Sequence, residues 1–402
     1  MTVTGNEAAL KAYSQQLHDE LQEILNFWMQ HTVDTQYGGF VAAVDNLNQP
    51  TAAAKGVVLN SRILWTFSAA WLHSPQPAYL DMAHRAFNYL CTYFVDTTYG
   101  GVYWSVQPNG SPADTRKQIY GLAFCIYGLA EYYKASKHPP ALHLAQQLFE
   151  AIEQHSFDKA NGGYFEAFNQ QWQPIQDLRL SDKDDNEKKT MNTHLHIIEA
   201  YANLYSVTGH PALRDKIIHL LEVFDKYIIN HQNGHLNLFM DENWQVKSTL
   251  VSYGHDIEAA WLLLECAQII QHHQYIKLYT ALSIQMANAA AEGLDADGAL
   301  WYEYEPLAEH LIKEKHWWPQ AEAMVGFLNA YQLCGQQPYL QQSLHAWQFV
   351  QQYLKDEKHG EWWWGVEADY SIIQKEKAGF WKCPYHNGRA CIEVIKRIQS
   401  IL

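Results

Sequence analysis

A glycine marker that recurs six times along the chain restricts its fold more than any other feature. In each copy an aromatic or large apolar residue follows the glycine within two positions, and the six glycines are Gly39, Gly101, Gly163, Gly234, Gly298 and Gly360. They are 62, 62, 71, 64 and 62 residues apart, and the first three copies share the sequence Asp-x-x-x-Gly-Gly. Self-similarity at a fixed period indicates one repeat architecture, so we predict a single domain over residues 1–402.

Apolar residues at helical spacing fill the segments between the markers. Leu17, Leu21, Ile24 and Trp28 precede the first marker, and a more apolar run, from Ile63 to Trp71, follows it after a loop. The first pattern is typical of an amphipathic surface helix and the second of a buried helix. Six such pairs predict twelve helices with short extended pieces in the loops.

Six buried helices inside six outer ones predict an all-α, closed, double-layered barrel. The alternative is an open solenoid, which needs polar capping repeats at its ends. The last helical segment, Cys391 to Leu402, instead keeps Ile392, Val394, Ile395 and Ile398. This apolar ending favours the closed barrel.

Composition excludes several classes of protein and partner. Hydrophobic residues make up 48% of the chain, which excludes disorder, and only 22 Gly and 13 Pro disfavour a turn-rich all-β fold. A formal charge of −15 argues against nucleic acid and anionic membranes as partners. We expect no signal peptide and no membrane span. None of the six cysteines forms a C-x-x-C pair, which predicts reduced thiols in a cytoplasmic protein without a zinc site.

Polar or aromatic side chains lie near the start of the second helix of each pair. Because the corresponding ends of six inner helices face one mouth of a barrel, these side chains are predicted to converge on one pocket. The set is Arg62, Tyr120, Asn192, His194, His196, His255, Glu258, Trp317, Trp318, Glu322, Trp381, His386 and Arg389. Trp318 and Trp381 carry flat, amphipathic rings that suit stacking on sugar faces.

Several of these residues also have a structural interpretation. His194 and His196 are two positions apart on a helix, so only one of them can face the pocket, and a zinc pair is not expected. His255 and Glu258 are three apart and share a face, either as a buried ion pair or as an imidazole controlled by a carboxylate. Arg62 is either an ion-pair anchor or an anion-binding group.

Two other segments carry the same two interpretations. Trp362, Trp363 and Trp364 follow the sixth marker and are predicted to be packing residues. The charge run from Asp182 to Lys189 is by default a solvated loop, but it leads directly into the third inner helix. That position allows the loop to overhang the pocket.

Imidazoles, a guanidinium and aromatic walls together suit proton transfer at carbon. A neutral imidazole is a base near pH 7 and becomes an acid once protonated, so two of them can remove and return a proton on opposite faces of one carbon. At C2 of an open-chain aldose the intermediate is an enediolate, whose charge Arg62 would stabilise. A glycosidase would instead need two carboxylates across the bond. Neither a metal nor a redox cofactor is required.

Five segments carry a resemblance to the N-acylglucosamine 2-epimerase superfamily. They are Asn60-Ser61-Arg62, Met191–His196, Ser252–Glu258, Trp317–Glu322 and Lys382–Arg389. The resemblance implies an (α/α)6 barrel with its site in the central cleft. Within the superfamily the chain is most similar to epimerases that interconvert glucose and mannose at the reducing end of β-1,4-linked disaccharides such as cellobiose and lactose. Such an isomerase needs a sugar but no cofactor, and we expect a monomer or homodimer.

The resemblance also implies roles for individual residues. His255 and His386 would be the acid/base pair, His196 would assist at the ring oxygen or O1, Arg62 would hold the enediolate oxygens, and Glu258 would orient His255. The sugar contacts that it implies are Tyr120, Asn192 and Trp318 for the reducing-end residue, and Trp381 and Asp184 for the second residue.

Other functions share much of this residue set. A mannose 2-epimerase or a mannose isomerase is the nearest alternative, and an isomerase would move the proton from C2 to C1. A sugar-binding barrel without catalysis is a weaker alternative.

Overall fold

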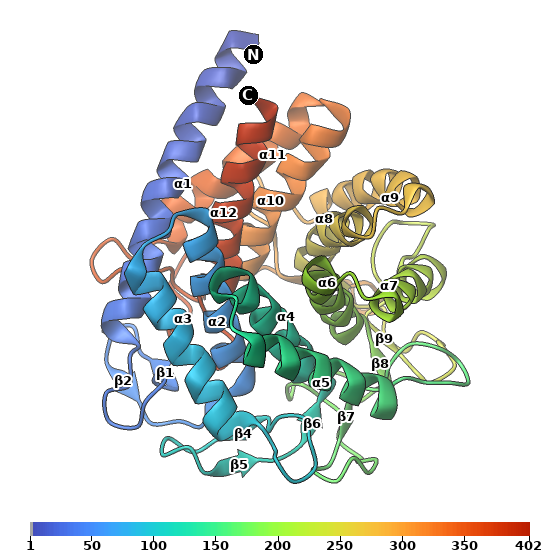
Figure 1. Cartoon of the computed structure of the whole chain (residues 1–402). Coiled ribbons are helices and arrows are strands. Elements are labelled where there is room, and N and C mark those ends of the chain that lie inside the picture. The colour runs from blue at the N-terminus through green and yellow to red at the C-terminus, as the bar shows by residue number, and fades with distance from the viewer. Residues whose placement is uncertain (1–2) are drawn as a thin grey trace.

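Twelve α-helices in two layers make up most of the chain, as the repeat predicts (Figure 1). The computed structural model describes residues 3–402, with side chains from residue 6 onward. The inner helices are α2 (Val57–His73), α4 (Ile119–Ser136), α6 (Met191–Thr208), α8 (Tyr253–Ile269), α10 (Trp317–Cys334) and α12 (Tyr385–Ile401). The outer helices are α1 (Val3–His31), α3 (Pro77–Tyr89), α5 (Pro139–His155), α7 (Pro211–Val223), α9 (His273–Ala291) and α11 (Gln337–Phe349).

The inner helices form a closed ring. Each contacts the next one along the chain, and α12 contacts α2 to complete the circle. The outer helix α1 packs on α12, so the two termini lie near each other in Figure 1. Ring closure confirms the (α/α)6 barrel and contradicts the open solenoid, and it explains why the last helix is apolar, since α12 has neighbours on both sides.

Burial differs between the two layers in the way the sequence pattern predicts. The inner helix α2 buries every residue from Val57 to Ala70. Its outer partner α3 buries only one face, which comprises Tyr79, Ala83, Ala86, Phe87 and Tyr89. A helix that is apolar nearly all round has neighbours on all sides, whereas an amphipathic one separates the core from water.

Short antiparallel strands link consecutive repeats at the end of the barrel where the inner helices begin. The strands before the inner helices are β3 (Lys55–Gly56), β6 (Lys117–Gln118), β8 (Lys189–Thr190), β10 (Val251–Ser252) and β13 (Lys315–His316). Each pairs with a strand of the next repeat, which is β4 (Ser105–Val106), β7 (Ala167–Phe168), β9 (Phe239–Met240), β11 (Glu303–Glu305) or β14 (Gly365–Val366), respectively. A bridge between Val44 and Ala378 joins the first repeat to the last.

The remaining elements are short additions to this scheme. They are the strands β1 (Ala43–Val44), β2 (Pro50–Thr51), β5 (Pro112–Asp114) and β12 (His310–Ile312), the π-turns Leu90–Phe94, Phe224–Ile228 and Val350–Leu354, and the 3-10 turn Pro306–Ala308. None of the described helices is long and apolar enough to cross a membrane. All six cysteines are free thiols, as predicted.

Ion pairs between lysines and aspartates hold five of the six marker turns against the segment that precedes the inner helix, which is a strand in all of these repeats except the last. The pairs with N–O distances of 2.6 to 2.8 Å are Lys55–Asp34, Lys117–Asp96, Lys189–Asp158 and Lys315–Asp295, and Lys377 pairs with Asp356 in the same way. All five lysine side chains are at most 2% exposed. Each turn is thereby fixed to the start of an inner helix, which is where the predicted site residues lie.

Candidate active site

One cleft of about 880 Å³ opens at the end of the barrel where the inner helices begin. This volume lies in the range of roughly 300–1,000 Å³ that is usual for small-molecule sites. The ten residues to which the resemblance assigns roles all line it, namely Arg62, Tyr120, Asp184, Asn192, His196, His255, Glu258, Trp318, Trp381 and His386. Of the other residues predicted to converge on the pocket, Trp317 lines it, whereas His194, Glu322 and Arg389 do not. The structure therefore brings together side chains that are more than three hundred residues apart in sequence, while their roles stay predictions.

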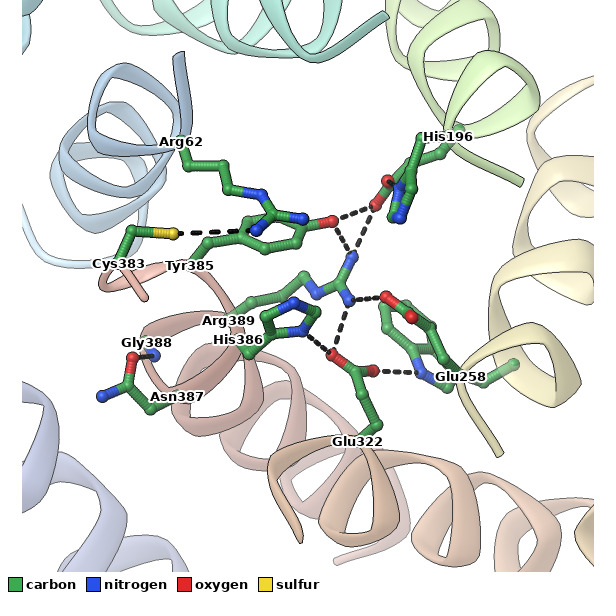
Figure 2. A network of polar contacts seen from close by, with 12 residues as sticks. Arg62, His196, Glu258, Glu322, Cys383, Tyr385, His386, Asn387, Gly388 and Arg389 are labelled. Carbon is green, nitrogen blue, oxygen red and sulfur yellow. Dashed lines mark hydrogen bonds and ion pairs between the residues drawn. The ribbon is translucent and has the colours of Figure 1, made fainter. Parts of the chain in front are cut away.

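Arg62, His196 and Glu258, which line the cleft, share one helical position with buried residues that do not line it. The sixth residues of the first five inner helices are Arg62, Phe124, His196, Glu258 and Glu322. Arg389 of α12 joins them, and Figure 2 shows five of these six side chains meeting near the barrel axis. Because the strand links fix where each helix begins, equal positions along the helices reach the same depth.

The fourth position of these helices faces the marker turns instead of the cleft. The Nε2 atom of His194 accepts a hydrogen bond from the backbone N–H of Tyr164 at 2.9 Å. Asp256 and Gln320, the fourth residues of α8 and α10, accept the corresponding bonds from Leu236 and Leu300 at 2.9 and 2.8 Å. His194 is therefore structural, and the prediction that only one of the two neighbouring histidines faces the pocket is confirmed.

Gly163 permits this arrangement of His194. Its φ of +74° is a left-handed conformation that favours glycine. A Cβ atom at this position would lie 2.8 Å from Nε2 of His194 and 2.4 Å from the Trp244 ring. The marker glycine thus fits the turn closely against the inner helix.

Arg389 is the ion-pair anchor of the site (Figure 2). Its Nη1 atom donates to Glu199 at 2.5 Å, and its Nη2 atom donates to Glu258 and Glu322 at 2.7 and 2.6 Å. The guanidinium is buried and joins three inner helices to α12. Its positive charge lies among three carboxylates, in an interior where unpaired charges are very costly.

Arg62, by contrast, forms no ion pair with a carboxylate among the side chains of residues 6–402. Its Nη2 atom donates to the Tyr120 hydroxyl at 2.9 Å, and its Nη1 atom donates to the Trp381 carbonyl at 3.4 Å. Its guanidinium carbon lies 4.1 Å from the Phe124 ring centre and 4.9 Å from that of Tyr385. A buried, uncompensated cation that lines a cleft suits an anionic ligand, so the ion-pair-anchor interpretation of Arg62 is wrong.

The three cleft histidines have different partners at Nδ1. His386 contacts Glu322 at 2.7 Å and His196 contacts Glu199 at 2.9 Å, so a carboxylate fixes each of these rings. The Nδ1 atom of His255 lies 2.8 Å from the Ser252 hydroxyl. Because each of these contacts occupies Nδ1, Nε2 is the ring nitrogen that remains for proton transfer.

The expected contact between Glu258 and His255 is wrong. The two residues share a face of α8, but Glu258 extends to the charged donor that Arg389 provides. His255 turns back to Ser252, which is the N-cap residue of α8. Ser252 and Glu199 are functional candidates that the sequence analysis missed. The signals were their positions, three residues before His255 and three residues after His196.

Burial is the largest influence on the histidines. It holds the pKa of His386 at about 3 against the opposing effect of Glu322. It also lowers the pKa of His196, and it lowers that of His255 well below the usual value with help from the Lys183 ammonium. These lowered pKa values make all three imidazoles neutral near pH 7 in the free protein, the form in which a ring can accept a proton.

Aromatic rings form the walls around the histidines. The Trp318 ring centre lies 4.6 Å from that of His255 and 5.7 Å from that of His386. A Cβ atom at position 254 would come within 2.5 Å of the Trp318 ring, so Gly254 allows this packing. Trp381 contacts Tyr120, with ring centres 6.0 Å apart.

Of the three consecutive tryptophans, Trp362 is fully buried and packs as predicted. Trp364 differs from the prediction because it also lines the cleft. Trp364 directly precedes strand β14, which pairs with the strand before α10, and this pairing brings Trp364 to the mouth.

The charge run forms one rim of the cleft. Lys183, Asp184, Asp185 and Glu187 all line it, so the alternative of a loop that overhangs the pocket is confirmed. Asp184 accepts hydrogen bonds from the backbone N–H and the hydroxyl of Ser181 at 2.9 and 2.8 Å. Lys183 pairs with Glu303 at 3.0 Å and thereby fixes the loop to the opposite rim.

One group within the described part of the chain has the spacing of metal ligands. It comprises Glu258, Glu322 and His386, with ligand atoms within 4.8 Å of one another. The Arg389 guanidinium already donates to both carboxylates and supplies the positive charge there. The donor set therefore fits an organic cation and leaves no need for a metal ion.

Comparisons with known proteins agree with this geometry. The family model for N-acylglucosamine 2-epimerase matches residues 38–390. A cellobiose 2-epimerase of Bacteroides fragilis is 46% identical over 95% of this chain and 98% of its own. The solved structure of cellobiose 2-epimerase from Bacillus thermoamylovorans has a TM-score of 0.93 at 37% identity, and covers 96% of this chain and 100% of its own. A D-mannose isomerase of Marinomonas mediterranea is 22% identical over 95% of this chain and 97% of its own.

Proposed function

The chain belongs to the N-acylglucosamine 2-epimerase family, and on that premise we propose that two histidines in its cleft epimerise C2 of a reducing-end sugar. The protein is a carbohydrate epimerase of the isomerase class, and it interconverts glucose and mannose at the reducing end of a disaccharide. The observation that carries this function is one cleft containing two neutral imidazoles beside Trp318 and the uncompensated cation Arg62. Similarity to cellobiose 2-epimerases over nearly the whole chain supports cellobiose and lactose as substrates.

The chemistry begins with the open-chain aldose, whose aldehyde makes the C2 proton acidic. One histidine takes this proton through Nε2, and the C–H electron pair passes into an enediolate. The other histidine, which must then be protonated, gives its Nε2 proton to the opposite face of C2. Arg62 holds the enediolate oxygens, and His196 serves the ring oxygen or O1. Each positioned acid or base supplies typically ~10²–10⁴-fold in rate.

The different Nδ1 partners of His255 and His386 support different protonation states of the two rings before the reaction. Glu322 places a carboxylate against Nδ1 of His386, whereas Ser252 places a neutral hydroxyl against His255. A carboxylate stabilises an imidazolium more than a hydroxyl does. Since both imidazoles are neutral in the free protein, the pair would take up one proton from water when the sugar binds. That proton belongs on His386, and His255 begins as the neutral base.

The second sugar would lie between Trp381 and the charge-run loop. Trp381 offers a ring for stacking and Asp184 offers a hydrogen-bond acceptor at the rim. Tyr120, Asn192 and Trp318 would surround the reducing-end residue. These five residues line one continuous cleft, which supports a disaccharide over a monosaccharide.

Three proposals concern the whole molecule. Residues 1–402 form one catalytic domain, because the inner helices of all six repeats contribute to one cleft. Free thiols at every cysteine support a cytoplasmic location. The protein acts as a monomer or homodimer, which sedimentation analysis would resolve.

Product analysis in heavy water tests the function. With cellobiose we expect a disaccharide that ends in mannose and carries deuterium at C2. Fructose formed from mannose would support the mannose isomerase alternative. Free glucose would reveal a hydrolase, and bound sugar without deuterium at C2 would reveal a binding barrel.

Substitution of either histidine tests the mechanism. We expect His255→Ala and His386→Ala each to lose at least about a hundredfold in epimerisation rate, because each removes one of two required proton carriers. Unchanged thermal unfolding would show that the fold is intact. Near-normal turnover in both variants would refute the two-histidine mechanism.

A further inference from the structure

The three carboxylates around Arg389 have unequal numbers of hydrogen-bond donors. Glu199 accepts from Arg389, from the Tyr385 hydroxyl at 2.7 Å and from His196 at 2.9 Å. Glu322 likewise accepts from three groups, which are Arg389, His386 and the Trp261 indole N–H at 3.0 Å. Both carboxylates therefore have the donors that an ionised buried group requires.

Glu258 has a single donor. Its Oε1 atom accepts from Nη2 of Arg389, the same nitrogen that also donates to Glu322. Its Oε2 atom is buried and has no hydrogen-bond partner anywhere in residues 6–402. An ionised carboxylate with half of its acceptor capacity unused and only 1% exposure would be strongly disfavoured.

The charge balance also disfavours an ionised Glu258. If all three carboxylates were ionised, the single charge of Arg389 would leave two negative charges uncompensated beneath the cleft. Arg62, the other cation facing Glu258, would then be attracted to this excess. The enediolate, which is itself an anion, would form against the excess negative charge.

We propose that Glu258 works as a neutral carboxylic acid with its proton on Oε2, which leaves the charge of Arg62 free for the enediolate. The inference rests on the proposed epimerisation and gives Glu258 an electrostatic role in place of orienting His255. Glu258 is a positioning residue in this sense, since it acts through Arg62 and Arg389.

The neighbours of Glu258 support this protonation state. Burial, followed by the Glu322 carboxylate, raises the pKa of Glu258 to about 8. The charged or titratable groups that face it from the other inner helices are Arg62 of α2, Tyr120 of α4, Glu199 of α6, Glu322 of α10, and Tyr385, His386 and Arg389 of α12. Burial acts to raise the pKa of Glu322 as well, but Arg389 and His386 hold that pKa at about 2. Of the three carboxylates, Glu258 is thus the one that stays protonated, independently of the proton that His386 takes up for the reaction.

Glu258→Gln is the decisive variant, because an amide copies a neutral acid in size and polarity. In the unsubstituted protein we expect kcat for cellobiose to fall roughly tenfold or more between about pH 7 and pH 9.5, as Glu258 ionises. In Glu258→Gln this alkaline decline should disappear, at the cost of no more than about a tenfold loss at pH 7. Glu322→Gln, which removes an ionised carboxylate, should lose at least about a hundredfold at pH 7.

Glu166→Gln is the matched control. Burial raises the pKa of Glu166 to about 8 as well, but this residue binds Thr190 and Thr193 outside the Arg389 network. Its variant should keep the alkaline decline. If Glu166→Gln abolishes the decline, or if Glu258→Gln keeps it and loses as much as Glu322→Gln, the inference is overturned.

A spectroscopic readout keeps the inference testable without turnover. The infrared spectrum of the unsubstituted protein minus that of Glu258→Gln at neutral pH should contain a protonated-carboxyl C=O band, because the contribution of Glu166 is the same in both proteins and cancels. Absence of this band from the difference would refute the inference. Absence of C2 deuteration in the unsubstituted protein would instead refute the proposed epimerisation. The two failures are therefore distinguishable.

Discussion

Ser252 offers the sharpest test of how the acid/base pair is held. Ser252→Ala deletes one hydroxyl that is 2.8 Å from Nδ1 of His255 and leaves a partly buried ring N–H without its acceptor. An unsatisfied buried polar group costs about 1–3 kcal/mol. If this cost falls on the tautomer that presents a free Nε2 lone pair, the rate should fall roughly fivefold to 150-fold, since each 1.36 kcal/mol is tenfold.

The assay is C2 deuterium uptake from heavy water, measured as kcat/KM for cellobiose. Ser252→Thr keeps a hydroxyl and should recover most of the loss. Ser68→Ala is the matched control, because it deletes a buried hydroxyl on inner helix α2 that bonds only the Leu64 carbonyl. Its rate should stay within about twofold of the unsubstituted protein. A Ser252→Ala rate equal to that of the control would refute the idea that this hydroxyl sets the tautomer.

Two further perturbations test one charge in the cleft and one charge in the fourth marker turn. Arg62→Met should lower kcat by about 10²–10³-fold, as for loss of an oxyanion donor, and a loss below tenfold in steady-state kinetics would contradict its role. Burial acts to lower the pKa of His235, but Asp256 and Glu292 outweigh it and raise that pKa. The stabilisation is therefore complete below the unfolded pKa of about 6.5 and is lost as pH rises through the folded value. Urea unfolding of His235→Gln should show a larger loss of stability at pH 5.5 than at pH 8.5, and equal losses would exclude the ion pair.

The fold was predictable because it repeats. A glycine turn at steps of 62 to 71 residues, with an amphipathic helix before it and an apolar helix after it, recurs six times, so errors in one copy are corrected by the others. The lysine partners of the marker aspartates did not stand out, because a lysine alone carries no signal of burial. Their role appears only when a three-dimensional contact such as Lys117–Asp96 is seen.

The convergence of these side chains on one cleft was predictable for the same reason, but their contacts were not. Helical periodicity shows that His255 and Glu258 share a face, yet it says nothing about a competing partner from another helix. Arg389 lies 131 residues from Glu258 in sequence, and its charge outcompetes the nearer imidazole. Local spacing therefore identifies which side chains reach the cleft, while long-range charge decides how they pair.

In the fourth repeat the marker turn is held without the lysine–aspartate pair that the other five repeats share. Asn230 and Val251 stand where the other five repeats have the aspartate and the lysine of the buried pair. In this repeat the marker turn is held instead by Asp256, which accepts from the Leu236 N–H and contacts His235. Asp256 follows the catalytic candidate His255 directly, so this turn is tied to the residue next to the reacting imidazole. The repeat that lost the common ion pair is thus the one in which the turn is attached closest to the chemistry.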